Sequence, residues 1–247
     1  MSVLSTTFHR WGSPPTFYRF AGRALPWFGW PALLLIVWGL YGALWQAPAD
    51  YQQGEGFRII YAHVPAAWMS LFIYTSMAVA GAIVLIWRMK VAEVYIAEAA
   101  LVGAGFTAVS LATGMLWGKP MWGTWWVWDA RLTSQLILLF LYLGVLALHQ
   151  ALPDARTAAR ACAILAVVGV INVPVVHYSV EWWNTLHQGA SITRLDKPAM
   201  PAAMLWPLLQ VALGCMLFFG WVVLIRMRAG ILWRERRQRW VQEVLTQ

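Results

Sequence analysis

A dense cluster of tryptophans is the part of this sequence best suited to binding a ligand. Within twelve positions the chain places five of its 18 tryptophans: Trp117, Trp122, Trp125, Trp126 and Trp128. Indole rings offer a broad, apolar and polarizable surface on which a flat ligand can stack. Tryptophan also favours membrane interfaces, but one or two residues would meet that need. The density of the cluster therefore indicates a binding surface for a planar molecule.

The spacing inside the cluster predicts a short helix. Pro120 suits the first turn of a helix. The positions i, i+3, i+4 and i+7 that follow are occupied by Trp122, Trp125, Trp126 and Asp129. These intervals place side chains on one helical face. We expect this helix to lie at the non-cytoplasmic interface of the membrane. It would present its indole rings on one face, with the Asp129 carboxylate at one end.

Two cations flank the cluster and indicate the kind of ligand. Lys119 and Arg131 can form charge-assisted hydrogen bonds with carboxylates at the edge of a bound molecule. Haem is a flat apolar macrocycle with two such carboxylates, and it is the ligand that we predict. Asp129 and Arg131 have a simpler alternative, a local ion pair or a helix cap before the next apolar segment. We assign neither residue to acid–base catalysis.

Two histidines are candidate iron ligands. His63 lies just before an apolar segment in which Pro65 marks the expected first helical position. The positive end of the helix dipole disfavours an imidazolium there, and metal ligation needs the neutral imidazole. His187 lies in a second tryptophan-containing segment that we expect on the same face. Each histidine taken alone is more often a polar loop residue, but two imidazoles on opposite sides of a porphyrin would complete six-coordinate iron.

The other histidines and the cysteines are weaker candidates. His177 lies at the outer end of an apolar segment and ranks below His187, because a packed, hydrogen-bonded role explains it easily. His9 and His149 are expected on the opposite face as solvated or snorkelling groups. Cys162 and Cys215 lie inside apolar segments without C-x-x-C spacing, which is typical of packing residues.

Composition places these residues in a membrane protein. Of 247 residues, 61% are hydrophobic and 11% are charged, whereas a soluble domain carries about 25% charged residues. Mean hydropathy is +0.60. Apolar stretches of membrane-spanning length predict an all-α polytopic membrane protein with a single domain over residues 1–247. We predict six transmembrane helices, at Pro26–Trp45, Ala66–Trp87, Ala97–Leu116, Leu132–Gln150, Ala159–His177 and Ala202–Ile225. The first is too long for a signal-peptide core and is expected to be retained.

Charge predicts the orientation. With a cytoplasmic N-terminus, the outside segments hold five of the 18 Lys and Arg residues, namely Arg58, Lys119, Arg131, Arg194 and Lys197. The other thirteen, including Arg10, fall inside, as the positive-inside rule requires. Both termini are therefore predicted to be cytoplasmic, with the tryptophan segment 117–131 on the periplasmic side. The basic tail, residues 226–247, is expected to anchor this topology rather than to bind nucleic acid.

Three motifs together resemble the WWD family of haem-handling membrane proteins. They are the run from Trp117 to Ser134, the Tyr-Ala-His-Val-Pro sequence around His63, and the segment from His177 to Gln188. The resemblance covers all six predicted helices. It implies that His63 and His187 are the axial ligands of haem. It also implies a haem platform formed by Trp122, Trp125, Trp126, Trp128 and Asp129, to which Trp117 is adjacent.

The resemblance further implies a setting in the bacterial inner membrane. The family handles haem b (iron protoporphyrin IX) as cargo in c-type cytochrome biogenesis and presents it to the haem chaperone CcmE. Its partners are the ABC-type subunits CcmA and CcmB and the small subunit CcmD. The sequence shows no nucleophile–base pair and no phosphate-binding loop, so we expect no enzyme, with ATP hydrolysis confined to a partner subunit.

The sequence leaves two other classes of membrane protein possible. A membrane b-type cytochrome would carry its ligand histidines on helices within the bilayer, whereas both candidates here lie at the outer boundary. A translocation channel would line its helices with buried charge. The apolar segments offer little beyond Glu98 and Asn172 for that purpose.

Overall fold

The computed structural model describes residues 12–187 and 200–246, which form helices joined by turns. The predictions for His9, Arg10, Arg194 and Lys197 lie outside these residues. No β-strand occurs within the described ranges, so the all-α prediction is confirmed. In chain order the elements are α2 (Pro14–Tyr41), the π-helix η1 (Gly42–Gln46), the 3₁₀-helix η2 (Glu55–Ile59), α3 (Ile60–Trp87), α4 (Lys90–Trp122), α5 (Ala130–Ala151), α6 (Ala155–Gly169), α7 (Asn172–Trp182), α8 (Ala202–Arg234) and α9 (Arg239–Leu245).

Six segments of the described chain are long and apolar enough to cross a membrane, which confirms a polytopic membrane protein with six predicted spans. They are Pro14–Gln46, Glu55–Trp87, Lys90–Trp122, Ala130–Ala151, Ala155–Trp182 and Ala202–Arg234. Each extends beyond the predicted bounds. The largest consequence concerns the second span, in which η2 leads directly into α3, so that helix begins before Pro65. His63 therefore lies inside the first turn of α3 rather than before it.

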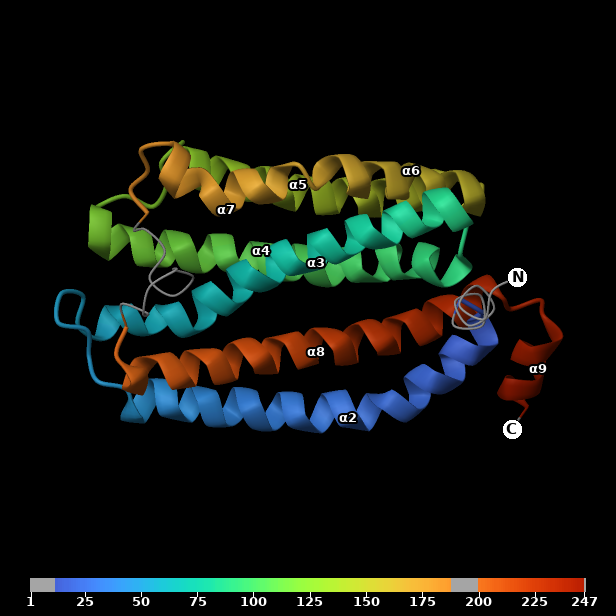
Figure 1. Cartoon of the computed structure of the whole chain (residues 1–247), viewed down its shortest axis with the longest axis horizontal. Coiled ribbons are helices and arrows are strands. Elements are labelled where there is room, and N and C mark those ends of the chain that lie inside the picture. Colours follow the sequence, from blue (N-terminus) through green and yellow to red (C-terminus); the bar gives the residue numbers. More distant parts are fainter. Residues whose placement is uncertain (1–11, 188–199, 247) are drawn as a thin grey trace.

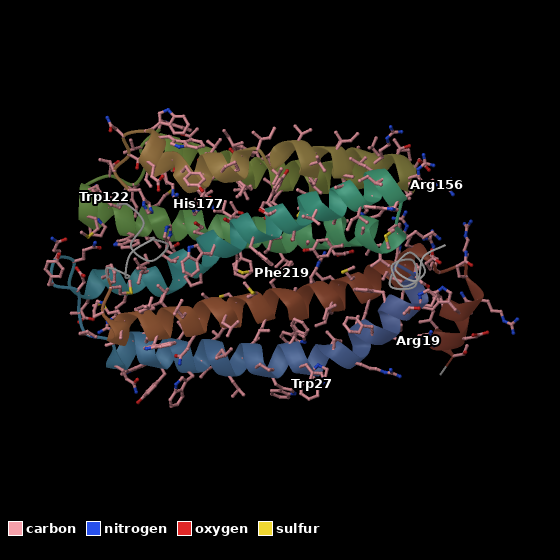
Figure 2. The ribbon with its side chains drawn as sticks, viewed as in Figure 1. Arg19, Trp27, Trp122, Arg156, His177 and Phe219 are labelled. Atoms are coloured by element: carbon pink, nitrogen blue, oxygen red, sulfur yellow. The ribbon has the colours of Figure 1, made fainter. Side chains whose placement is uncertain are left out.

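The helices run along one axis as a bundle (Figure 1). Helix α2 packs beside α8, α3 packs against α4, and α5 lies with α6 and α7 on the far side of that pair. The start of α2 and the helix α9 lie at one end of the bundle, where Figure 2 labels Arg19 and Arg156. Trp122 and His177 lie at the opposite end, here called the aromatic end. The connections after α2, α4 and α7 thus share one end, as predicted.

The fifth span is broken into two helices, whereas the sequence predicted one continuous helix over Ala159–His177. Helix α6 ends at Gly169 and α7 begins at Asn172. Pro174 lacks the N–H that would continue the α-helical ladder to Val170, and the Val170 carbonyl instead accepts a tighter bond from Val173 N at 2.9 Å. The Asn172 side chain donates to the Ser134 carbonyl at 2.9 Å, which fixes the break against α5. Asn172 is therefore a structural residue at this break.

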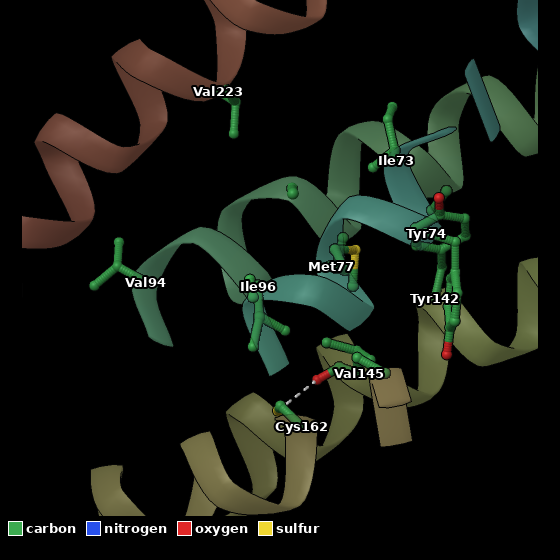
Figure 3. Packing of buried hydrophobic residues seen from close by; sticks show 14 of the residues in the cluster. Ile73, Tyr74, Met77, Val94, Ile96, Tyr142, Val145, Cys162 and Val223 are labelled. Atoms are coloured by element: carbon green, nitrogen blue, oxygen red, sulfur yellow. Dashed lines mark hydrogen bonds between the residues drawn. The ribbon is translucent and has the colours of Figure 1, made fainter. Parts of the chain in front are cut away.

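The core between α3, α4, α5 and α6 contains polar groups that are satisfied within it (Figure 3). The rings of Tyr74 and Tyr142 meet edge to face at 5.0 Å between centroids. The Tyr142 hydroxyl donates to the Ser70 carbonyl at 2.6 Å. The Cys162 thiol donates to the Val145 carbonyl at 3.4 Å and is buried. Such burial fits the packing role that the sequence predicted for this cysteine.

Ion pairs tie the start of α4 to the end of α8, away from the aromatic end. Residues 226–234 of the predicted basic tail continue α8, and α9 follows them. Glu98, considered above for a translocation path, pairs with Arg226 at 2.8 Å. The other pairs across this junction are Lys90 with Glu235, at 2.7 Å, and Glu93 with Arg234. The charged residues at this end of the bundle therefore join α4 to α8.

Candidate functional site

Three residues of helix α4 surround the imidazole of His63. His63 is 9% exposed, and its Nδ1 lies 3.0 Å from Oγ1 of Thr113. The indole of Trp117 meets the imidazole edge-on, with 5.7 Å between ring centroids. A Cβ at Gly114 would approach the His63 Cε1 to 3.2 Å, so the glycine gives the ring its space. His63 is thus a buried and well-oriented side chain.

His187 brings a second imidazole to the same place from the segment that follows α7. The two rings lie 6.2 Å apart between centroids, and their planes are inclined by 34°. His63 lies on α3, so only the tertiary fold brings these distant parts of the chain together. The two histidines lie at the same end of the bundle as the tryptophan cluster, as predicted, while their role as ligands stays a prediction.

Both histidines line a pocket at the aromatic end of the bundle, between α3, α4, α5 and α7. Part of its wall is apolar and includes Val64, Trp68, Leu111 and Val176. Its polar lining consists of His63, Ser110, Thr124, Asp129, Arg131, Gln135, His177, Glu181 and His187. Indoles of the cluster complete the wall, namely Trp117, Trp122, Trp125 and Trp126. An apolar pocket with a few convergent polar groups is the usual form of a small-molecule site.

The tryptophan segment lines this pocket with the end of α4 and with a loop, residues 123–129, that leads into α5. Helix α4 continues through Pro120 to Trp122 and is ended by Gly123, whose positive φ of 76° suits a glycine C-cap. Residues 123–129 contain no helix, and α5 begins at Ala130. Thr124 bridges the loop, since its Oγ1 donates to the Trp126 carbonyl at 2.9 Å. This corrects the prediction of a short helix beginning at Pro120.

The indoles of the cluster differ in their surroundings. Trp117 is buried and donates through Nε1 to Oε1 of Gln53 at 2.8 Å. This bond joins the connection between η1 and η2 to the pocket wall. Trp126 lines the pocket, and its Nε1 is buried without a hydrogen-bond partner among the described residues. Trp128 does not line the pocket and packs edge-on against Trp126, with ring centroids 5.2 Å apart. Lys119 also lies outside the lining, and its Nζ donates to the Gly123 carbonyl at 3.1 Å.

Asp129 and Arg131 connect the pocket to the helices around it. The Asp129 carboxylate accepts from Leu132 N at 2.8 Å and so caps the start of α5, the simpler role considered from the sequence. Arg131 donates through Nη1 to the carbonyls of Val176, at 2.7 Å, and His177, at 3.4 Å. The arginine thereby joins α5 to α7. Both residues also line the pocket, where they can interact with its occupant.

Sequence reasoning missed several residues that the fold brings to the site. Thr113 and Gly114 stand four and three positions before Trp117 on α4, so helical periodicity would have placed them on the same face. Gln135 follows Arg131 by one helical turn on α5 and lines the pocket. Glu181 follows His177 by the same interval on α7. Glu181 lies beyond the predicted end of the fifth span at His177. The other three residues lie inside predicted spans, and the missing signal for them was the packing between helices that brings them to the pocket.

The fold and the site define a polytopic helical membrane protein with a histidine pair and tryptophans lining a pocket at one end of its bundle. The sequence profile of the family described as "Heme exporter protein C" matches residues 7–242, nearly the whole chain. The chain belongs to this family. The resemblance inferred from the tryptophan cluster and the two histidine motifs is thereby confirmed.

Named relatives from several bacteria support this assignment. The "Heme exporter protein C" of Escherichia coli strain K12 is 51% identical over 239 residues, which are 97% of this chain and 96% of that protein. The protein of the same name from Haemophilus influenzae is 48% identical over 95% of both chains. That from Bradyrhizobium diazoefficiens is 46% identical over 91% of this chain and 85% of its own length. The match therefore extends across all six spans.

Proposed function

We propose that this chain binds haem in the pocket at the aromatic end, with His63 and His187 as axial ligands. The observation that carries the proposal is the spacing of these two rings, 6.2 Å between centroids. Metal–imidazole bonds of about 2 Å, plus the radius of each ring, put the centroids of two trans ligands roughly 6 Å apart. The porphyrin supplies four nitrogens to the iron, and two imidazoles complete its coordination.

The pocket walls supply the remaining contacts that haem needs. Trp122, Trp125 and Trp126 offer indole surface for stacking on the porphyrin. Among the described residues of the lining, Arg131 is the arginine that can meet a haem carboxylate, and Lys119 lies close to the same loop. Trp122 and Trp125 are substantially exposed, which leaves an edge of the bound haem open to a partner. The site is thus suited to a cargo that must both bind and leave.

The proposed role is haem delivery in cytochrome c biogenesis. The relatives are named heme exporter proteins, and the chain shares about half of their residues over nearly their full length. We infer that it works in the bacterial inner membrane, with the basic end of the bundle in the cytoplasm and the aromatic end in the periplasm. There it would hand haem b to the chaperone CcmE, in a complex with CcmA, CcmB and CcmD. ATP hydrolysis would then belong to the ABC-type partners.

A hemin titration of the detergent-purified chain tests the proposal. We expect a low-spin absorption spectrum with a sharpened Soret band, because two imidazoles on iron produce a strong ligand field. The titration is expected to saturate at one hemin per chain. A protein that gives only the spectrum of hemin in empty detergent micelles would contradict haem binding.

Replacing Trp126 with phenylalanine is expected to weaken hemin binding by about tenfold or more. The buried Nε1 of Trp126 has no acceptor among the described residues, and the strong acceptors of haem are its two carboxylates. A hydrogen bond to a charged group contributes about 1.5–3 kcal/mol, and about 1.4 kcal/mol corresponds to a factor of ten. The dissociation constants of hemin for the wild type and the variant measure this contribution.

Hemin dimethyl ester provides the internal comparison for this variant. Its esters are weaker acceptors than carboxylates, so the wild type is expected to prefer hemin, and Trp126→Phe is expected to lose most of that preference. Trp45→Phe serves as the control, because Trp45 is an exposed indole in η1 that does not line the pocket. An equal loss of affinity for hemin and its ester would indicate lost stacking and would rule out the proposed hydrogen bond.

A further inference from the structure

The Thr113 side chain has an arrangement of hydrogen bonds that determines the chemical form of His63. Its Oγ1 lies 3.0 Å from the His63 Nδ1. The same oxygen lies 2.6 Å from the Val109 carbonyl, one helical turn earlier, and 3.2 Å from the Ser110 carbonyl. All three neighbours are thus within hydrogen-bonding distance of one hydroxyl group.

Counting protons assigns the direction of each bond. A carbonyl oxygen only accepts, so the single hydroxyl proton of Thr113 is directed to the backbone of its own helix, with Val109 as its nearer acceptor. The Thr113 oxygen then has lone pairs for His63 but no proton to give it. The His63 Nδ1 must therefore carry the hydrogen and donate it to Thr113. A neutral imidazole protonated at Nδ1 has its free lone pair on Nε2, which becomes the metal-binding nitrogen.

The surrounding contacts keep the ring in this state. His63 is buried, and Trp117 packs against it from the same helix face that carries Thr113. Gly114 would crowd the ring if it carried a Cβ. Turning the imidazole over would place the carbon Cδ2 where Nδ1 stands, so the bond to Thr113 would be lost. The orientation and the tautomer are therefore fixed together.

We propose that Thr113 is a positioning residue that presents His63 to haem iron through Nε2 while leaving this ligand only moderately basic. The inference rests on the haem site proposed above. Metal-bound histidines commonly donate their second N–H to a carboxylate or a carbonyl, and such partners orient the ring and raise its basicity. A neutral hydroxyl orients the ring but draws its proton less strongly. Thr113 thereby supplies orientation without the strong iron bond that would retain a transferable cargo.

Four variants on α4 separate this role from simple packing. Thr113→Val keeps the shape of the side chain and removes the acceptor, and Thr113→Ser restores the hydroxyl. Thr107→Val is the matched control, since Thr107 is buried on the same helix and donates to the Gly103 carbonyl at 2.7 Å without touching His63. Thr113→Ala repeats the removal of the acceptor with a smaller side chain, should valine disturb the packing of α4.

The proposal predicts a change in ligation that packing alone would not cause. Loss of a residue supporting a metal ligand typically costs about 10- to 100-fold in affinity. We therefore expect Thr113→Val to release hemin to apomyoglobin at least about tenfold faster than the wild type. Its midpoint potential is expected to rise, because a less basic imidazole stabilises ferric iron less. The ferric electron paramagnetic resonance spectrum should shift with it, whereas Thr113→Ser and Thr107→Val should match the wild type.

The outcomes distinguish this inference from the function on which it rests. A wild-type protein without a low-spin haem spectrum would remove the proposed haem site itself. A normal wild-type spectrum, with Thr113→Val and Thr113→Ala indistinguishable from Thr107→Val in release rate and potential, would overturn the role of Thr113 alone. Faster release, a raised potential and rescue by Thr113→Ser would establish it.

Discussion

Replacing His63 or His187 with alanine is expected to lower the affinity of the purified chain for hemin by at least about a hundredfold. Loss of a residue that only supports a metal ligand costs about 10- to 100-fold, so loss of the ligand itself should cost no less. The two rings lie 6.2 Å apart, and removal of either leaves one axial position of the iron without its imidazole. Haem content per polypeptide and hemin titrations measure the effect.

Added imidazole makes this test specific for ligation. Each alanine substitution opens a space of about the size of imidazole, so millimolar imidazole is expected to restore the low-spin spectrum of either variant. His149→Ala provides the control, because His149 is exposed in the last turn of α5, at the opposite end of that helix from the pocket. Haem content equal to the wild type in both His63→Ala and His187→Ala would refute the ligand assignment.

The six apolar spans could be predicted well from the sequence because a bilayer imposes simple requirements. A helix must stay apolar for the thickness of the hydrocarbon core, and this constraint is visible in the run of residue types. Consecutive spans also reverse direction, so the connections after the first, third and fifth spans must share one end. His63, the tryptophan segment and His187 therefore meet at that end, as the structure shows.

The conformation of the tryptophan segment could not be obtained from side-chain periodicity. The intervals among Trp122, Trp125, Trp126 and Asp129 fit one helical face, but Gly123 stops α4 in a left-handed conformation. A glycine at this position is a strong helix terminator, and Pro120 lies in the last turn of a long helix rather than the first turn of a new one. The backbone conformations of Gly123 and Pro120 therefore determine the local structure, rather than the spacing of the aromatic side chains.

The finer chemistry of the site depends on contacts between helices that no local pattern contains. The bond between Thr113 and His63 exists because α3 and α4 pack closely, and residues fifty positions apart meet across that interface. The bonds from Arg131 to the carbonyls of α7 arise in the same way. Sequence periodicity identifies the face on which Thr113 lies, but only the packing identifies its partner.

That packing depends on glycines at close approaches, and the second large effect is expected there. Replacing Gly103 with valine should lower the thermal midpoint of the detergent-solubilised chain by about 10 °C, since each kcal/mol shifts a protein of this size by about 2–4 °C. A side chain at Gly103 would overlap the ring of Tyr142, which donates to the Ser70 carbonyl. Overpacking costs about 1–3 kcal/mol, and leaving a buried polar group unpaired costs about 1–3 kcal/mol more.

The effect of Gly103→Val should also reach the haem pocket. Ser70 accepts from Gln135 Nε2 at 3.0 Å, and Gln135 lines the pocket, so a displaced Tyr142 disturbs a chain of bonds that ends at the site. Gly105→Val is the matched control on the same helix, because a Cβ at Gly105 meets nothing within 4 Å. Thermal melts and hemin titrations of both variants separate the two contributions. If the two valines lower the midpoint equally, helix propensity rather than contact with Tyr142 determines stability at this position.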